Sequence, residues 1–168
     1  YKVYYPAAYY AAYFSIRAKA FSYEKMCFGR ERLKEFLDPL RARYQDDKGR
    51  RQLSNNEKDS YRDMKLAEEM YARGVNFAPI DLYTVDAHRC RVLEDGRLMA
   101  SLDSVEGLGE KAADSIVQAA REGEFLSRDD FRRRTGTGKS MIETLDRFGI
   151  MKGLPETNQI SLFDGWGL

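Results

Sequence analysis

The sequence contains little of what a metal centre or a disulfide framework requires. Among 168 residues there are two cysteines, Cys27 and Cys90, and one histidine, His88. The cysteines lie far apart and lack the CxxC spacing of zinc sites, so a structural zinc ion is not expected. Two unpaired thiols are typical of a reducing cytoplasm, where disulfides are rare.

Long apolar runs and a strong excess of one charge are also missing. No apolar run approaches the roughly 18 residues that a membrane-spanning helix needs, so no membrane partner is expected. The formal net charge is only +1. Any nucleic-acid site must therefore arise from a local arrangement of residues rather than from overall attraction.

The chain does not begin with methionine, and residues 1–5 resemble the last turn of an element that started earlier. We therefore expect a piece of a longer protein whose remaining part holds the catalysis. Composition predicts three parts, namely a helical region over residues 1–74, a mixed region over residues 75–153 and a loose tail over residues 154–168.

Residues 1–74 carry helical patterns. Pro6 suits the start of a helix over residues 7–20, and a second helix is expected over residues 29–44, interrupted by Pro39. A charged loop follows over residues 45–53. The aromatic face of the first helix, which indicates core packing rather than base stacking, consists of Tyr9, Tyr13 and Ile16 with Tyr10 and Phe14 as a second stripe.

A third helix should begin at Ser54, because Ser54 and Glu57 have the spacing of a capping box. Gly74 should end it. Short strands are expected over residues 80–83, 89–93 and 97–100, the last two joined by a turn at Asp95-Gly96. With helical patterns from residue 102 onward, the predicted fold is mostly α with a small antiparallel β hairpin.

The main functional signal is the segment from Leu102 to Ile116, centred on Val105–Gly109, in which a short helix, a Gly107-Leu108-Gly109 turn and a second helix follow one another. Both glycines allow a positive φ and leave the backbone bare, and Leu108 should be buried. Free amides at the start of a helix attract anions, and Lys111 adds a positive charge there. The pattern predicts a helix-hairpin-helix that holds a DNA phosphate, with a purely structural turn as the alternative.

Acidic residues around this segment oppose tight binding. Residues 101–125 hold six acids and two bases, and Glu106 stands where the motif usually has proline. Backbone amides tolerate this environment, but repulsion of phosphate should lower the affinity.

A degenerate second hairpin is expected between a helix capped by Ser127 and a further helix over residues 139–149. Arg132, Arg133 and Arg134 suit phosphate contacts, although a solvated helix end explains them equally well. The same two explanations apply to four other arginines, namely Arg41, Arg43, Arg50 and Arg51. The segment 135–140 resembles a nucleotide-binding P-loop but lacks its first glycine, since Arg133 stands there, so that interpretation is rejected.

The tail contains Gln159, Ile160, Ser161, Leu162 and Phe163. Leu162 and Phe163 would anchor an extended peptide in a groove on a partner, with Gln159 fixing the register. The alternative is that both side chains fold back on this chain.

These residues together resemble the C-terminal region of PolC-type DNA polymerase III alpha subunits, the bacterial replicative polymerases of family C. The resemblance runs through residues 1–14, 80–83, 107–109, 123–127 and the tail. It implies that the early helices close the fingers region and that the later part binds primer–template double-stranded DNA behind the active site. Residues 159–163 resemble the family's peptide for the sliding clamp (the beta subunit), with Ile160 in place of leucine.

The resemblance also implies what this stretch does not carry. The catalytic aspartates of the family lie in the palm, and none of the acids here matches them. No cofactor is expected in this stretch, while the rest of the polymerase chain would use magnesium and carry a proofreading exonuclease.

Two rival functions remain open. In the first, the hairpin packs on neighbouring domains and only the tail binds a partner, which would make the chain a protein-interaction module. In the second, the motif serves a base-excision enzyme, for which Asp146 is the only acid at a suitable distance after the hairpin.

Overall fold

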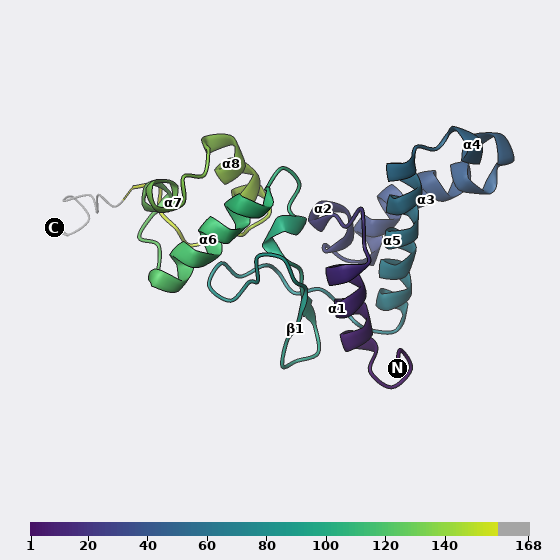
Figure 1. The fold of residues 1–168 in the computed structure, drawn as a ribbon, viewed down its shortest axis with the longest axis horizontal. Helices are drawn as coiled ribbons and strands as arrows, with labels where there is room; N and C mark the ends of the chain where they lie inside the picture. Colours follow the sequence, from purple (N-terminus) through teal and green to yellow (C-terminus); the bar gives the residue numbers. More distant parts are fainter. Residues whose placement is uncertain (158–168) are drawn as a thin grey trace, which may run out of the picture. The chain divides into compact units, whose positions relative to one another are not determined.

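The computed structural model describes residues 1–157, which divide into two compact units (Figure 1). The first unit comprises Tyr1–Ile80 and Val85–Glu106, and the second comprises Asp81–Thr84 and the described residues from Gly107 on. Sequence alone placed a boundary between residues 74 and 75. The contacts of the chain instead keep most of residues 75–106 with the N-terminal helices.

Helices build most of the first unit: α1 (Pro6–Ile16), α2 (Tyr23–Met26), α3 (Arg30–Gln45), α4 (Asp47–Gln52) and α5 (Asn55–Ala72). The predicted capping box opens α5, because the Glu57 amide donates to Ser54 Oγ at 3.1 Å and the Ser54 amide donates to Glu57 Oε2 at 2.8 Å. Gly74 follows the helix with a φ of +81°, as a C-terminal cap requires.

Two helix predictions in this unit were wrong. α3 continues through Pro39, since its packing along α5 offsets the hydrogen bond that proline removes. The expected loop over residues 45–53 contains α4, whose first turn is capped by Asp46 through the Gly49 amide at 2.6 Å. A charged segment therefore folds as a helix because a side chain satisfies its first amides.

The core of the first unit uses the second aromatic stripe of α1. Tyr10 and Phe14 are buried, as expected for core packing, whereas the expectation was wrong for Ile16 of the first stripe, which is 80% exposed. Asp63 of α5 is fully buried and fixes the chain after α1, accepting bonds from Tyr13 Oη at 2.9 Å and from two backbone amides.

The small sheet consists of β1 (Arg91–Val92) and β2 (Leu98–Met99), which pair antiparallel. The Asp95-Gly96 turn joins them, and Gly96 has a φ of +85°. Residues 80–83 are not a strand, because the Tyr83 amide bonds the Asp81 carboxylate at 2.8 Å and turns the chain. The predicted fold class is confirmed.

The second unit packs α6 (Glu110–Glu122), α7 (Arg128–Thr135) and α8 (Lys139–Arg147) around buried Ile116, Phe131 and Leu145. Ser127 caps α7 as predicted, accepting from the Asp130 amide at 3.0 Å. No helix within residues 1–157 combines the length and the apolar character needed to cross a membrane.

Candidate nucleic-acid interface

The first hairpin leads into α6 through Gly107, Leu108 and Gly109. Gly107 has a φ of +87°, which favours glycine, while Gly109 is extended with φ −74° and ψ 166°. The expected positive φ is therefore found at Gly107 only. Leu108 is buried as predicted, with 5% of its surface exposed. Gly109 and the following residues Glu110 and Lys111 are exposed at the start of the helix.

The second hairpin repeats this geometry at the start of α8. Gly136 has a φ of +70°, and Gly138 is extended with φ −70° and ψ 157°. The segment 135–140, which resembled a P-loop, is thus the turn between two helices. It is a regular hairpin, not a degenerate one, and Lys139 lies directly after it.

The two hairpins also share a burial pattern. Counted from the turn, the same three positions are buried in each, namely Leu108, Ala113 and Ile116 in the first and Thr137, Ile142 and Leu145 in the second. A repeated helix start with the same glycines and the same core positions is a paired helix-hairpin-helix unit.

The first amides of α6 and α8 are not used within the described part of the chain. Within residues 1–157, the amides of residues 109–112 and 138–141 donate no hydrogen bond. α7 differs, because its first amides donate to the carbonyls of Pro155 and Glu156 at 2.8 and 3.1 Å. Two of the three helix starts in this unit are therefore left open to an anion.

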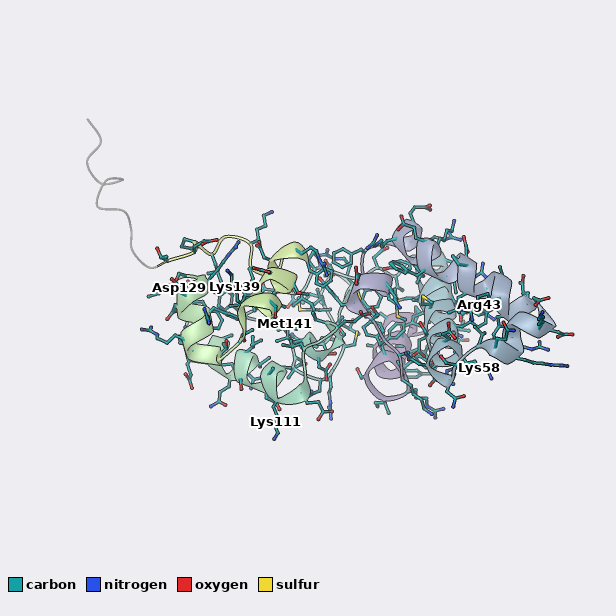
Figure 2. All side chains as sticks on the ribbon, turned by 90° about the horizontal axis from the view of Figure 1, so that it is seen from above. Arg43, Lys58, Lys111, Asp129, Lys139 and Met141 are labelled. Atoms are coloured by element: carbon teal, nitrogen blue, oxygen red, sulfur yellow. The ribbon has the colours of Figure 1, made fainter. Side chains whose placement is uncertain are left out.

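The hairpins lie next to each other. A Cβ atom placed on Gly107 would come within 3.2 Å of the Met141 methyl group, which belongs to the first turn of α8. Figure 2 shows Met141 on this helix and Lys111 extending from α6. The two open helix starts are thus neighbours, separated by little more than the Met141 side chain.

Val105 and Glu106 both make hydrogen bonds within the first unit. The Val105 amide donates to the Leu102 carbonyl at 3.2 Å, and its side chain is buried. Leu102 begins the short 3-10 helix η1 (Leu102–Ser104). Glu106 accepts a hydrogen bond from Ser22 Oγ at 2.6 Å. Val105 therefore has no free amide for a phosphate, and the Glu106 carboxylate is held by a hydroxyl of the first unit.

The arginine triplet divides into different environments. Arg134 caps the end of α6, donating to the carbonyls of Ala119 at 2.5 Å, Gly123 at 3.0 Å and Glu124 at 3.1 Å. Arg133 pairs with Asp130 at 2.8 Å but keeps 75% of its side chain exposed. Arg132 is exposed and makes no ion pair within residues 1–157. Arg134 thus has a structural use that sequence could not reveal.

Asp130 organises the start of α7. Its carboxylate accepts from the Leu126 amide at 3.0 Å and from the guanidinium groups of Arg133 and Arg134. The Leu126 hydrogen bond and the two arginines hold the pKa of Asp130 below its usual value. The carboxylate is therefore ionised at neutral pH and serves the fold.

The side chains here that could act as a nucleophile or as a general acid or base are either buried or ion-paired. Burial raises the pKa of Cys27 well above its usual value and that of Cys90 to about 12. Asp146 pairs with Arg128 at 2.6 Å. Within residues 1–157, no three His, Cys, Asp or Glu side chains are arranged to hold a metal ion. Residues 159–163 lie outside the described residues.

Comparison with known proteins agrees with this geometry. Residues 74–160 match the family model described as a helix-hairpin-helix motif, and the chain belongs to this family. It is 40% identical over 167 residues to "DNA polymerase III PolC-type" of Clostridium perfringens, and 42% identical over 167 residues to the protein of that name from Streptococcus agalactiae. These alignments cover 97% and 98% of the chain but 11% of each relative. The chain therefore spans about a tenth of these relatives, and the resemblance inferred from sequence is confirmed.

Proposed function

We propose that the second unit holds duplex DNA by its phosphates, through the open helix starts of α6 and α8. The observation that carries this proposal is the contrast with α7, whose first amides are closed by the chain's own carbonyls. Amides at a helix start bind anions without reading base sequence. Contact of this kind suits a protein that must hold any sequence.

The pairing of the hairpins supports a duplex rather than a single phosphate group. Two adjacent anion sites, each followed by a lysine at Lys111 or Lys139, match two phosphates of one nucleic-acid molecule. The second hairpin has no acid from residue 135 to residue 142. It therefore offers the more favourable electrostatic environment of the two.

The names of the relatives support assigning this role to one part of a larger protein. Because they are named DNA polymerase III PolC-type, we infer that the chain is the duplex-binding part of such a polymerase and holds its primer–template. Polymerisation, proofreading and the magnesium ions they use would belong to the rest of the polymerase chain. The residues described here would position the substrate.

The salt dependence of duplex binding tests the proposal. Lys111→Ala and Lys139→Ala should each lower the slope of log K against log salt by about 0.9, the value for one lost phosphate contact. Arg121→Ala is the matched control, an exposed base ten residues after Lys111 on α6 and therefore about 15 Å away along the axis. Binding to labelled duplex is measured by fluorescence anisotropy at several salt concentrations. Identical slopes for all three variants would favour a protein-interaction module instead.

We also propose that residues 159–163 tether the chain to the sliding clamp. Leu162→Ala with Phe163→Ala should weaken binding to purified clamp about a thousandfold, since buried anchors of such peptides each contribute about 2 kcal/mol. Trp166→Ala removes an apolar side chain outside the pentapeptide and should leave the affinity unchanged. Calorimetry with the clamp measures both, and equal effects would exclude the pentapeptide as the recognition element.

A further inference from the structure

The first unit contains a basic groove that the hairpins do not explain. It has a volume of about 990 Å³ and follows α5 from Lys58 to Ala72, with residues of α3 and α4 along it. At 1.5 Å per residue this stretch of helix is about 21 Å long. Figure 1 shows α3 and α5 side by side with α4 at their connected ends, and Figure 2 marks Lys58 on this unit.

Bases outnumber acids in this groove by six to three. The bases are Arg30, Arg50, Arg51, Lys58, Arg62 and Lys65. Within residues 1–157, Arg51, Lys58 and Lys65 make no ion pair, although all three are exposed. Surface bases without acidic neighbours present their full charge to an incoming anion.

The acids of the groove are neutralised by other bases. Glu68 binds Arg41 at 2.7 Å, and Glu69 binds Lys2 at 2.6 Å, and neither partner lines the groove. Asp59 binds Arg62 at 2.9 Å. Arg50 is likewise compensated by an acid outside the lining, Asp47, at 2.6 Å, so the groove keeps the excess of bases that its lining residues show.

The bases of α5 form a row. Lys58, Arg62 and Lys65 are spaced at i, i+4 and i+7, which places them on one helix face with axial rises of about 6 and 4.5 Å. This spacing is close to the step between neighbouring phosphates of an extended nucleic-acid strand. A compact anion would use one or two of these side chains, whereas a strand would use them all.

Two stacked tyrosine rings line the groove beside the bases, and one of them is buried. Tyr44 and Tyr61 stack with ring centroids 4.3 Å apart, and Lys65 Nζ lies over the Tyr61 ring, 5.3 Å from its centroid. Tyr61 is only 7% exposed. Tyr61 therefore offers no apolar anchor, whereas Tyr44 is half-buried and leaves part of its ring open beside the bases.

We propose that this groove binds the phosphate backbone of a single-stranded nucleic acid. A volume of about 990 Å³ suits a strand lying between helices. A duplex instead contacts proteins over a broad surface of about 1,000 to 2,500 Å². Basic grooves that track a backbone bind single strands without sequence preference and with strong salt dependence. This site is separate from the hairpins and does not depend on them.

The test is binding of a fluorescein-labelled twelve-residue oligothymidylate to the full chain at low salt. The variant Arg51→Gln/Lys58→Gln/Lys65→Gln should weaken binding at least about tenfold and lower the salt slope by about 2, since each single-strand phosphate contact contributes about 0.7. None of the three bases has an acidic partner in residues 1–157, so their loss leaves no orphaned charge. The fold should therefore be retained.

A control variant with the same change in charge distinguishes binding in the groove from general electrostatic attraction to the unit. Arg17→Gln/Lys19→Gln/Arg89→Gln removes three exposed bases of the same unit that do not line the groove, and it should change the affinity less than about threefold. Equal losses in both triple variants would overturn the proposal. So would displacement of the oligonucleotide by duplex DNA or by thymidine triphosphate at matched phosphate concentration.

Discussion

Valine at Gly109 or Gly138 is expected to weaken duplex binding by about tenfold to a hundredfold. Both glycines are extended and lie at the open helix starts, so a branched side chain would stand where a phosphate must approach the amides. A lost hydrogen bond to a charged group costs about 1.5 to 3 kcal/mol, which corresponds to this range. The double variant should bind more weakly than either single variant.

These substitutions should leave the fold intact. The φ values of −74° and −70° are accessible to valine, and a Cβ at either position meets no atom within 4 Å. Gly107→Ala and Gly136→Ala are the informative contrast, because their φ values of +87° and +70° strain any other residue by about 1–2 kcal/mol.

Anisotropy with labelled duplex gives the affinity, and thermal unfolding shows whether each variant is folded. Folded valine variants that bind duplex as tightly as the parent chain would show that these amides do not contact phosphate. The groove in the first unit is tested in the same variants, since oligothymidylate binding should survive the loss of both hairpins.

Local sequence signals predicted the elements whose stabilising contacts lie within a few residues. Ser54 with Glu57 and Ser127 with Asp130 fix helix starts through bonds three residues apart. The Asp95-Gly96 turn likewise needs only the φ that glycine allows. In each case the chemistry that forms the element is visible in a short stretch of sequence.

Predictions failed where distant contacts decide the structure. Ile16 has the right spacing for the core face of α1, but Tyr10 and Phe14 are the residues that pack there. Periodicity alone does not choose between two neighbouring apolar stripes. The continuous α3 depends in the same way on its packing along α5.

The second hairpin shows how a signal can be present and misread. The segment 135–140 has glycines at the same relative positions as Gly107 and Gly109, followed at matching distances by Ile142 and Leu145. Comparison of the two segments in register would have shown that the expected second hairpin is regular rather than degenerate. Thr137 made it look degenerate, because a hydroxyl residue occupies the buried position that Leu108 fills in the first hairpin.

Substitutions of Arg134 and Arg132 are expected to affect stability differently, although both residues belong to one arginine triplet. Arg134→Met should destabilise the second unit by about 2 to 4 kcal/mol, because it removes bonds to three carbonyls at the end of α6 and a contact with Asp130. Its guanidinium also lies 4.5 Å from the centroid of the Phe125 ring, a further contact that methionine lacks.

Arg132→Met is the matched control, since it makes the same chemical change on the same helix at an exposed position. It should alter stability by less than about 0.5 kcal/mol. Amide hydrogen exchange over α6 and α7 measures both effects, because it reports the opening free energy of each helix separately. If Arg134→Met left this protection unchanged but reduced the salt slope of duplex binding, Arg134 would be a phosphate contact, and the carbonyl cap would contribute little to the fold.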